Sequence, residues 1–439
     1  MNIKLVFLSI VMASQITLFA QELITPEKAI ALALEHNYGI KLANTDVEVA
    51  KNNASVLNSG YLPTLNGNAG ATYNVNNSFN EFSDGRTPVD LNGAESSRYN
   101  ASVDLNYVLF DGLGRSYNYK QFKENQQLTE LEARETIENT VIQLFTIYYN
   151  VAELIENNNA LTKTLNISKD RLIRSEYQFD YGQSTKLEVL NAEVDINNDS
   201  INIMNSKQQL NNYKRDLNLV LGNTIAGDFN VYTEVAFNSL YNKSELLEKA
   251  KINNINLLQI EKSIAINNLG VKFQKSAYLP TLGLTGSYGW NKNNNNAASF
   301  VAVSTNTGFS GGLNLSWNLF DGGSTLTQVK NAKINLEANN IQKEQLQVTI
   351  ERDFNNAWDD YQNKLNIYRL QIENIKTSKN NFDRTQEKFK LGQVNSIEFR
   401  QAQLNLLNAE LSKNQAKYLA KLAELQLLQL SGDILNMAF

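Results

Sequence analysis

Two long stretches without proline or glycine restrict what this chain can fold into. Residues 115–181 and 324–391 contain neither residue type, and proline in particular interrupts helices because it lacks an amide hydrogen and clashes with the preceding turn. A continuous helix over either stretch would be about 100 Å long at 1.5 Å per residue. Because a helix of that length cannot be the core of a globule, we expect an elongated and largely helical protein.

The sequence also contains an internal duplication. Three pairs of motifs occur in the same order in both halves: YLPTL at 61–65 and 278–282, LFDG at 109–112 and 319–322, and F-x-x-G-Q at 179–183 and 389–393. Each copy is too long to be one unit of a solenoid. We therefore expect a duplicated domain with copies at 21–222 and 244–432, joined by a linker or equatorial segment at 223–243 and followed by a tail at 433–439.

Each copy is predicted to contain one β-hairpin, at about 61–111 and about 278–320. In the return strands, apolar residues such as Val103 and Leu313 alternate with polar ones such as Asp104 and Asn314. Runs of about ten residues with this pattern are typical of strands that cross a bilayer at a tilt. A half-buried soluble sheet shows the same alternation, and both interpretations stay open at this point. The Asn- and Gly-rich linkers Asn76–Ser97 and Lys292–Gly308 are expected to be exposed loops.

The rest of each copy is predicted to be helical. A helix precedes each hairpin, and the long helices are expected at about 113–181 and 322–391. Returning helices are expected at about 185–221 and 395–431. Apolar residues in these segments recur at alternating steps of three and four, which is the periodicity of coiled coils. Several positions of the apolar seam hold Asn or Lys instead, and this favours a wide barrel of helices over a tight two-stranded rod.

A short turn joins each long helix to its returning helix. Gly182 and Gly392 are placed to adopt the left-handed conformation that ends many helices. Thr185 and Asn395 would cap the next helix, and Glu188 and Glu398, three residues later, would complete capping boxes. Ala192 and Ala402 are small residues where close helix packing is expected. The turn is either a simple connection between helices or a functional tip. A single turn would favour the simple connection, but its occurrence in both copies makes the two interpretations about equal.

Composition excludes several classes of function. The net charge of −5 and the pI near 5.3 argue against a nucleic-acid-binding protein, which needs a basic face. There is no cysteine and only one histidine, His36, so disulfides, thiolate chemistry and multi-histidine metal sites are ruled out. No paired-carboxylate motif or phosphate-binding glycine loop stands out. We expect neither an enzyme nor a bound metal or cofactor, and we interpret His36 as a structural residue near a helix end.

The N-terminus has the pattern of a secretory signal peptide. A short basic start is followed by the apolar run Leu5–Ala13 and by a small, polar segment ending at Ala20. We expect residues 1–20 to be removed, although a buried N-terminal helix is an alternative. The apolar run is shorter than the ~20 residues of a membrane-spanning helix.

Four strands cannot close a barrel, so hairpins that cross a membrane would require several copies of the chain.

The paired motifs, YLP before each first strand, LFDG after each second strand and the F-x-x-G turn, resemble those of the TolC-type outer-membrane efflux proteins. The resemblance covers about residues 22–432. It implies an α+β membrane protein: a homotrimer with a twelve-stranded β-barrel, four strands per chain, continuous with a long α-helical barrel. It also implies a mixed belt near the chain ends of the repeats. It also implies a passive exit duct in the outer membrane that extends into the periplasm and docks to a periplasmic adaptor and an inner-membrane transporter. Lipidated members carry an N-terminal cysteine, which is absent here.

The resemblance also implies which residues form the functional tips. The adaptor-docking tips would be Tyr181, Gly182, Gln183 and Ser184 in the first copy and Leu391, Gly392, Gln393 and Val394 in the second. The acidic ring that narrows the aperture maps to Glu398, and a second acidic position maps to Gln401. A basic residue that latches the closed state in some members is replaced by Val394. Glu398 therefore has two possible roles, helix cap or pore-lining carboxylate.

A competing function from another class remains. The chain could be a non-transport periplasmic coiled-coil scaffold whose hairpins form a soluble sheet. The exported substrate and the class of pump are not readable from the sequence, because the family's ducts serve many.

Overall fold

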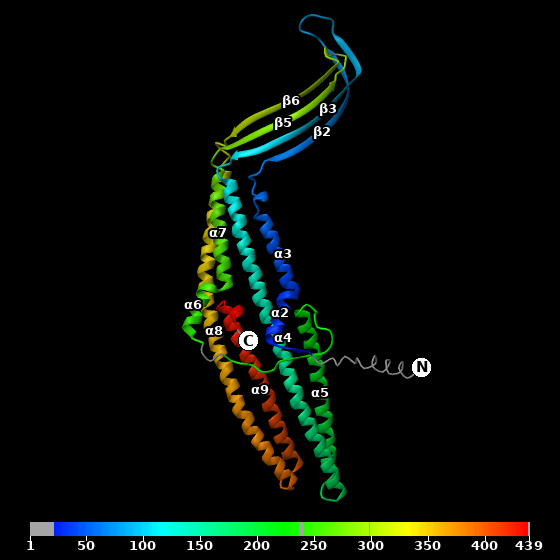
Figure 1. Cartoon of the computed structure of the whole chain (residues 1–439), viewed down its shortest axis with the longest axis vertical. Coiled ribbons are helices and arrows are strands. Elements are labelled where there is room, and N and C mark those ends of the chain that lie inside the picture. The colour runs from blue at the N-terminus through cyan, green and yellow to red at the C-terminus, as the bar shows by residue number, and fades with distance from the viewer. Residues whose placement is uncertain (1–21, 238–240, 298, 438–439) are drawn as a thin grey trace, which may run out of the picture. The chain divides into compact units, whose positions relative to one another are not determined.

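The computed structural model describes residues 22–237, 241–297 and 299–437. The expected signal peptide at 1–20 lies outside the described residues, as do the last two residues of the expected tail. Figure 1 labels most of the elements. In chain order they are β1 (Glu22–Ile24), α2 (Pro26–His36), α3 (Tyr38–Asn53), η1 (Val56–Asn58), β2 (Thr64–Asn80), β3 (Val89–Phe110), α4 (Gly114–Asp180), α5 (Lys186–Val220), β4 (Phe229–Val231), α6 (Lys243–Asn253), α7 (Ile255–Ser276), β5 (Thr281–Asn294), β6 (Val303–Ser316), α8 (Ser324–Lys390), α9 (Ser396–Leu430) and η2 (Ile434–Asn436).

The long helices lie where the proline- and glycine-free stretches place them. α4 and α8 are each 67 residues long, and the returning helices α5 and α9 are each 35 residues long. All four begin and end within two residues of the ranges expected from the sequence. Their predicted apolar seam is largely buried, with Leu144, Tyr148 and Val151 of α4 and Leu425 of α9 almost fully covered. Packing of this seam, rather than intrinsic helix propensity, stabilises helices of this length.

The chain forms two compact units, and neither coincides with one sequence repeat. One unit contains the described residues up to Asp46, Leu131–Leu258 and the residues from Glu344 onward; the other contains Val47–Glu130 and Gln259–Lys343. Each unit is therefore assembled from both copies of the duplicated sequence. The duplication describes the topology of the chain, whereas the compact units follow from how the copies pack together.

The second unit contains a four-stranded antiparallel sheet with the strand order β2-β3-β5-β6. The two hairpins are joined where β3 pairs with β5, so that β2 and β6 each pair on only one side among the described strands. This arrangement is an open sheet with two free edges.

The hairpins differ from the sequence-based expectation in two respects. Asn76–Ser97 and Lys292–Gly308 were expected to be exposed loops, but most of these residues are strand, and only 81–88 and 295–302 connect the strands. The Asn-rich ends continue the ladder because their backbone groups find cross-strand partners, which outweighs the low strand propensity of Asn. The second hairpin also ends earlier than predicted, because β6 ends at Ser316 and not near residue 320.

The LFDG motifs connect the sheet to the long helices. Gly112 and Gly322 adopt left-handed backbone conformations, with φ of 67° and 70°. The carboxylates of the preceding aspartates then cap the helices: Asp111 accepts from the backbone N–H of Arg115, and Asp321 from that of Thr325, each at 2.8 Å. The motif thus provides both the turn and the helix cap at the start of α4 and α8.

The first unit contains a short parallel sheet near the chain ends of the repeats, where the resemblance implies a mixed belt. β1 pairs in parallel with β4, which lies within the expected linker 223–243. The Tyr148 hydroxyl lies 2.8 Å from the carbonyl oxygen of Ile24 and accepts a hydrogen bond from the Tyr232 N–H. Tyr418 of α9 donates to the Thr233 carbonyl at 2.9 Å. Burial, chiefly, raises the pKa of both tyrosines well above its ordinary value, so they remain protonated donors.

In both copies, an asparagine between two short helices donates a hydrogen bond to the end of the returning helix. Asn37 lies between α2 and α3, and its side-chain amide donates to the Val220 carbonyl at 2.9 Å. Asn254 lies between α6 and α7 and donates to the Leu430 carbonyl at 3.1 Å. Each asparagine oxygen also accepts a backbone N–H at the start of the next helix. His36 ends α2 beside this junction, with its Nε2 3.5 Å from Glu35 Oε1.

A glycine in the left-handed conformation follows each returning helix at these junctions. A Cβ on Gly222 would come within 2.5 Å of the His36 carbonyl oxygen, and one on Gly432 would collide with the Asn253 carbonyl. Gly182 and Gly392 at the hairpin turns also have positive φ, but a Cβ there would meet nothing within 4 Å. At Gly222 and Gly432, both the left-handed backbone and the lack of space for a Cβ require glycine. At Gly182 and Gly392, only the left-handed backbone favours it.

We expect Gly432→Ala to destabilise the protein by about 3 kcal/mol, because it adds a steric collision to the left-handed strain. Gly392→Ala is the matched control and should cost only about 1 kcal/mol, since it carries the strain alone. Thermal unfolding of the purified protein, followed by circular dichroism, measures both. Equal losses in the two variants would show that the close approach at Gly432 can relax without cost.

Candidate functional site

The first candidate site is the pair of helical-hairpin tips, where α4 turns into α5 and α8 turns into α9 (Figure 1). Gly182 and Gly392 have φ of 73° and 70°. In each tip, the glycine N–H bonds to a carbonyl three residues earlier, and the next residue's N–H bonds to one five residues earlier. This is the Schellman pattern, which satisfies the last carbonyls of a helix while reversing the chain.

The capping boxes expected after the two glycines are present in only one copy. In the second tip, the Asn395 side chain accepts the Glu398 N–H at 2.8 Å, and Glu398 Oε2 accepts the Asn395 N–H at 3.1 Å. The prediction for Thr185 and Glu188 is wrong, because Thr185 makes no side-chain cap. There the Glu188 N–H is already bonded to the Thr185 backbone carbonyl at 3.1 Å, which leaves the side chain without that partner.

The predicted tip residues lie together and are mostly exposed to solvent. Tyr181 and Leu391 present large apolar side chains, with 79% and 71% of their surface exposed. Gly182, Gln183, Gly392 and Gln393 are also exposed, whereas Ser184 and Val394 are half-buried. Single exposed apolar side chains are common on protein surfaces, so both interpretations of the turn stay open.

The two tips differ in their internal support. Phe389 stacks on Phe399 with ring centroids 4.7 Å apart, and Val394 packs against the same cluster. At the equivalent positions of the first copy, Phe179 is exposed and the partner is Val189 rather than an aromatic residue. An aromatic pair of this geometry contributes about 0.5–1.5 kcal/mol beyond its buried area. The second tip therefore has an aromatic contact that the first tip lacks.

The two predicted aperture residues are close to the second tip and exposed. Glu398 keeps its capping bonds while its side chain remains accessible to solvent, so the two roles considered for it are compatible. Gln401, one turn further along α9, donates to Asn405 Oδ1 at 2.9 Å. Only Glu398 of this pair carries a charge.

A polar cluster not predicted from the sequence joins the two hairpins. Arg400 of α9 donates to both carboxylate oxygens of Asp199 on α5, at 2.9 and 2.7 Å. Ser168 of α4 donates to Asp199 Oδ2 at 2.6 Å. Arg171 of α4, almost fully buried, is paired with Asp195 of α5. The charges of α4, α5 and α9 thus meet in one cluster, which we call the inter-hairpin cluster.

Small residues allow the helices to approach closely at this level. Ala192 of α5 and Ala402 of α9 are buried, as expected from the sequence.

The ion pairs of the inter-hairpin cluster add little net stability, because burying charges is costly. Removing one partner, however, leaves an uncompensated charge and typically costs about 3–5 kcal/mol. The cluster thus fixes which faces of the hairpins meet. Its sequence signal is the spacing of Asp195 and Asp199, four residues apart, which places both on one helix face.

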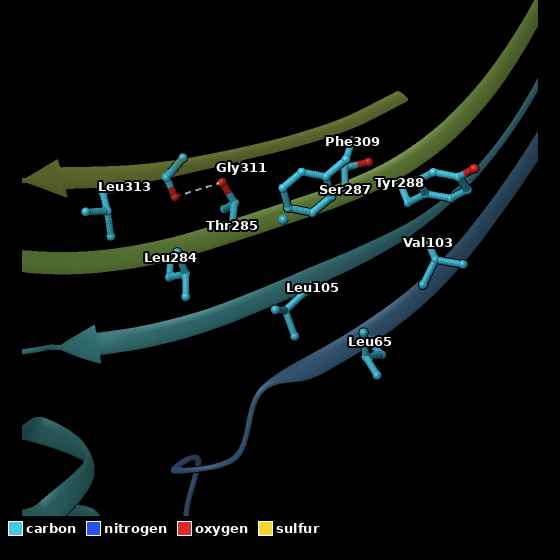
Figure 2. Close-up of a pocket in the computed structure, with 12 residues that line it drawn as sticks. Leu65, Val103, Leu105, Leu284, Thr285, Ser287, Tyr288, Phe309, Gly311 and Leu313 are labelled. Atoms are coloured by element: carbon cyan, nitrogen blue, oxygen red, sulfur yellow. Dashed lines mark hydrogen bonds between the residues drawn. The ribbon is translucent and has the colours of Figure 1, made fainter. Parts of the chain in front are cut away.

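The second candidate site is the sheet, which has one apolar and one polar face. Cross-strand pairing aligns Val103 with Tyr288 and Tyr288 with Phe309, and it aligns Leu284 with Leu313. These residues project from one face, as Figure 2 shows. Their side chains are largely exposed; Phe309 and Leu313, for example, are 76% and 68% exposed. An exposed apolar surface on both hairpins favours contact with a membrane over a soluble sheet.

An open hollow of about 650 Å³ lies on this apolar face. Gly286 and Gly311 are paired across β5 and β6 and leave space between larger side chains. The lining of the hollow consists of Leu65, Val103, Leu105, Leu284, Thr285, Gly286, Ser287, Tyr288, Phe309, Gly311, Gly312 and Leu313.

The opposite face is polar. Asn66, Asp104, Ser287 and Ser310 form one row across the four strands. Further rows on this face consist of Asn, Ser, Thr and Gly, with Arg98 in the last row of this face to which all four strands contribute. The alternation predicted from the sequence is therefore the observed register of the sheet. Toward the loops, the apolar register also holds polar side chains, among them Glu95 and Lys292.

Within the described parts of the chain, no group of three or more acidic or histidine side chains could hold a metal ion. Among the described helices, none combines the length and the apolar composition that crossing a membrane would require.

The sequence and the fold were compared with known proteins. The profile of the family described as "Outer membrane efflux protein" matches residues 29–223 and 246–433. The outer membrane efflux protein BepC of Brucella suis is 21% identical over 412 residues, which cover 92% of this chain and 84% of BepC. The outer membrane protein TolC of Vibrio cholerae is 22% identical over 381 residues, covering 86% of this chain and 83% of that protein.

Solved structures show the same fold. The CmeC outer membrane channel of Campylobacter jejuni superimposes with a TM-score of 0.78 at 18% identity, over 93% of this chain and 86% of CmeC. The outer membrane protein VceC of Vibrio cholerae gives a TM-score of 0.71 at 13% identity, over 93% of this chain and 96% of VceC. With its two matched segments, its duplicated hairpins and its 67-residue helices, this chain belongs to the outer membrane efflux protein family.

Proposed function

We propose that this protein is a passive exit duct of the outer membrane, formed by three copies of the chain and extending into the periplasm. The observation that carries the proposal is the four-stranded sheet with an apolar face and two free edges, connected directly to 67-residue helices. Efflux channels among the relatives, such as BepC and CmeC, support the same function.

The free edges argue for an assembly. A strand edge exposed to lipid would leave backbone N–H and C=O groups without partners, at a cost of several kcal/mol each. Edge β2 of one copy pairing with edge β6 of the next would satisfy these groups and close the sheet. Membrane barrels of bacteria need at least eight strands, so two copies is the minimum. The number three, and hence twelve strands, is taken from the family.

The helical tips are proposed to receive cargo from the inner membrane side. At 1.5 Å per residue, α4 and α8 are about 100 Å long, which suits a periplasmic extension. The exposed tip residues would contact a periplasmic adaptor, and the adaptor would link the duct to an inner-membrane transporter in a tripartite efflux or type I secretion system. The duct itself is proposed to do no chemistry, so that the transporter supplies the energy.

The membrane assignment is tested by two adjacent residues of β6. We expect Leu313→Arg to cost about 2–4 kcal/mol near the bilayer midplane and to reduce assembly, because it places a charge on the lipid face. Asn314→Arg is the matched control, since its side chain is on the polar face, and it should assemble normally. The amount of trimer in the outer-membrane fraction measures both. Equal loss in both variants, or wild-type protein that is soluble in the periplasm, would instead support a scaffold with a soluble sheet.

The docking assignment is tested at the turns. We expect Gln183→Trp and Gln393→Trp to abolish export while trimers remain in the membrane, because both side chains are exposed at the tips. Lys379→Trp is the control, since Lys379 is exposed on α8 several turns from the tip. Export of a cargo and trimer content are measured in the same cells. If trimers are lost together with export, the tip residues are structural rather than docking residues.

The aperture assignment is tested at Glu398. Three carboxylates brought near one axis would attract cations and repel anions. We expect Glu398→Gln to lower the cation selectivity in planar bilayers, and to weaken block by multivalent cations, which prefer oxygen ligands. Thermal stability should change little, because Gln also completes a capping box. Unchanged selectivity and block would leave Glu398 with the capping role alone.

A further inference from the structure

The polar face of the sheet is nearly free of charge. From the row of Thr64 and Asn106 to the row of Thr72 and Arg98, the described polar face consists of Asn, Ser, Thr and Gly side chains, with two exceptions. The exceptions are Asp104 and Arg98, both on β3. A wall of neutral amides and hydroxyls gives little discrimination between cations and anions, so any charge preference of this section depends on those two residues.

Asp104 is held in one orientation by donors from three strands. Its Oδ2 accepts from Asn68 Nδ2 on β2 at 2.7 Å and from Ser102 Oγ on β3 at 2.8 Å. Ser287 on β5 also donates to this carboxylate. A carboxylate that accepts several hydrogen bonds is kept at a defined place without being neutralised by a cation. Among the described residues, no ion pair to Asp104 is present.

Arg98 is oriented in a similar way at the loop end of the sheet. Its Nε donates to Asn293 Oδ1 of β5 at 3.0 Å, and its side chain is exposed. Six residues separate Arg98 from Asp104 on the same strand, which corresponds to about 20 Å. The two charges are thus too far apart to form a pair, and each acts on its own level of the polar face.

We propose that Asp104 is the residue that sets cation preference in the sheet section of the duct, and that Arg98 opposes it at the loop end. This inference rests on the proposed function, because it requires the polar face to line a lumen. Three-fold symmetry would place three Asp104 carboxylates at one level and three Arg98 guanidinium groups at another. The section would favour cationic and neutral cargo at the level of Asp104.

The size of the effect follows from electrostatics in water. One unit charge at about 10 Å changes the local concentration of a monovalent ion about twofold, before screening. The Debye length is about 30 Å at 0.01 M salt and about 3 Å at 1 M. The preference should therefore be measurable at low salt and should disappear at high salt.

The test uses the full-length protein in planar bilayers at about 0.01 M and 1 M KCl. Asp104→Asn should lower the ratio of potassium to chloride permeability about twofold or more at low salt, whereas Arg98→Gln should raise it. Each change is also introduced into the Glu398→Gln background, so that the aperture charge cannot mask the effect. At 1 M salt, both shifts should vanish.

Glu95→Gln is the matched control. Glu95 is on the same strand but in the apolar register, and its replacement should leave the ratio unchanged. If Asp104→Asn and Arg98→Gln conduct like the wild type with an unchanged ratio, the inference is overturned while the duct stands. If the same shift follows Glu95→Gln, the effect is not specific to the polar face and the inference also fails. If the wild type forms no channel, the proposed function fails and this inference fails with it.

Discussion

Backbone hydrogen bonding at the edges of the sheet is the constraint from which the assembly follows. Among the described strands, β2 and β6 have partners on one side only, and the four-stranded sheet presents an apolar face. In lipid, unpaired backbone groups are too costly to persist, so a sheet of this kind needs further copies of itself. The proposed trimer therefore follows from an incomplete hydrogen-bond ladder, and only the number of copies rests on the family.

The duplication has produced equivalent elements with different degrees of support. The junctions at Asn37 and Asn254 share a donated bond to the last carbonyl of the returning helix and an accepted bond from the next helix. The tips are not equivalent. One has a stacked aromatic pair and a capping box, and the other has neither.

The inter-hairpin cluster connects the two helical hairpins near their tips. Its ion pairs connect α5 with α4 and with α9, and three of its members, Ser168, Arg171 and Asp199, are almost fully buried. Desolvation offsets much of the Coulomb attraction in such pairs, so the cluster contributes specificity of packing more than stability. It defines one relative position of the two hairpins just behind the tips.

Periodicity and punctuation in the sequence determined the local elements. Absence of proline and glycine located the long helices, glycine located the turns, and alternation located the strands, because each of these signals acts over a few neighbouring residues. The family resemblance supplied the fold class and the residues of the tips. Tertiary structure alone decided the rest. The strands continue through the Asn-rich segments because cross-strand partners were available there. The Thr185 side chain does not cap its helix, because the Glu188 N–H is bonded to the Thr185 backbone carbonyl instead. Residues some 200 positions apart come together where β1 pairs with β4 and where Arg400 contacts Asp199. No local pattern encodes such contacts, since they depend on how both copies pack.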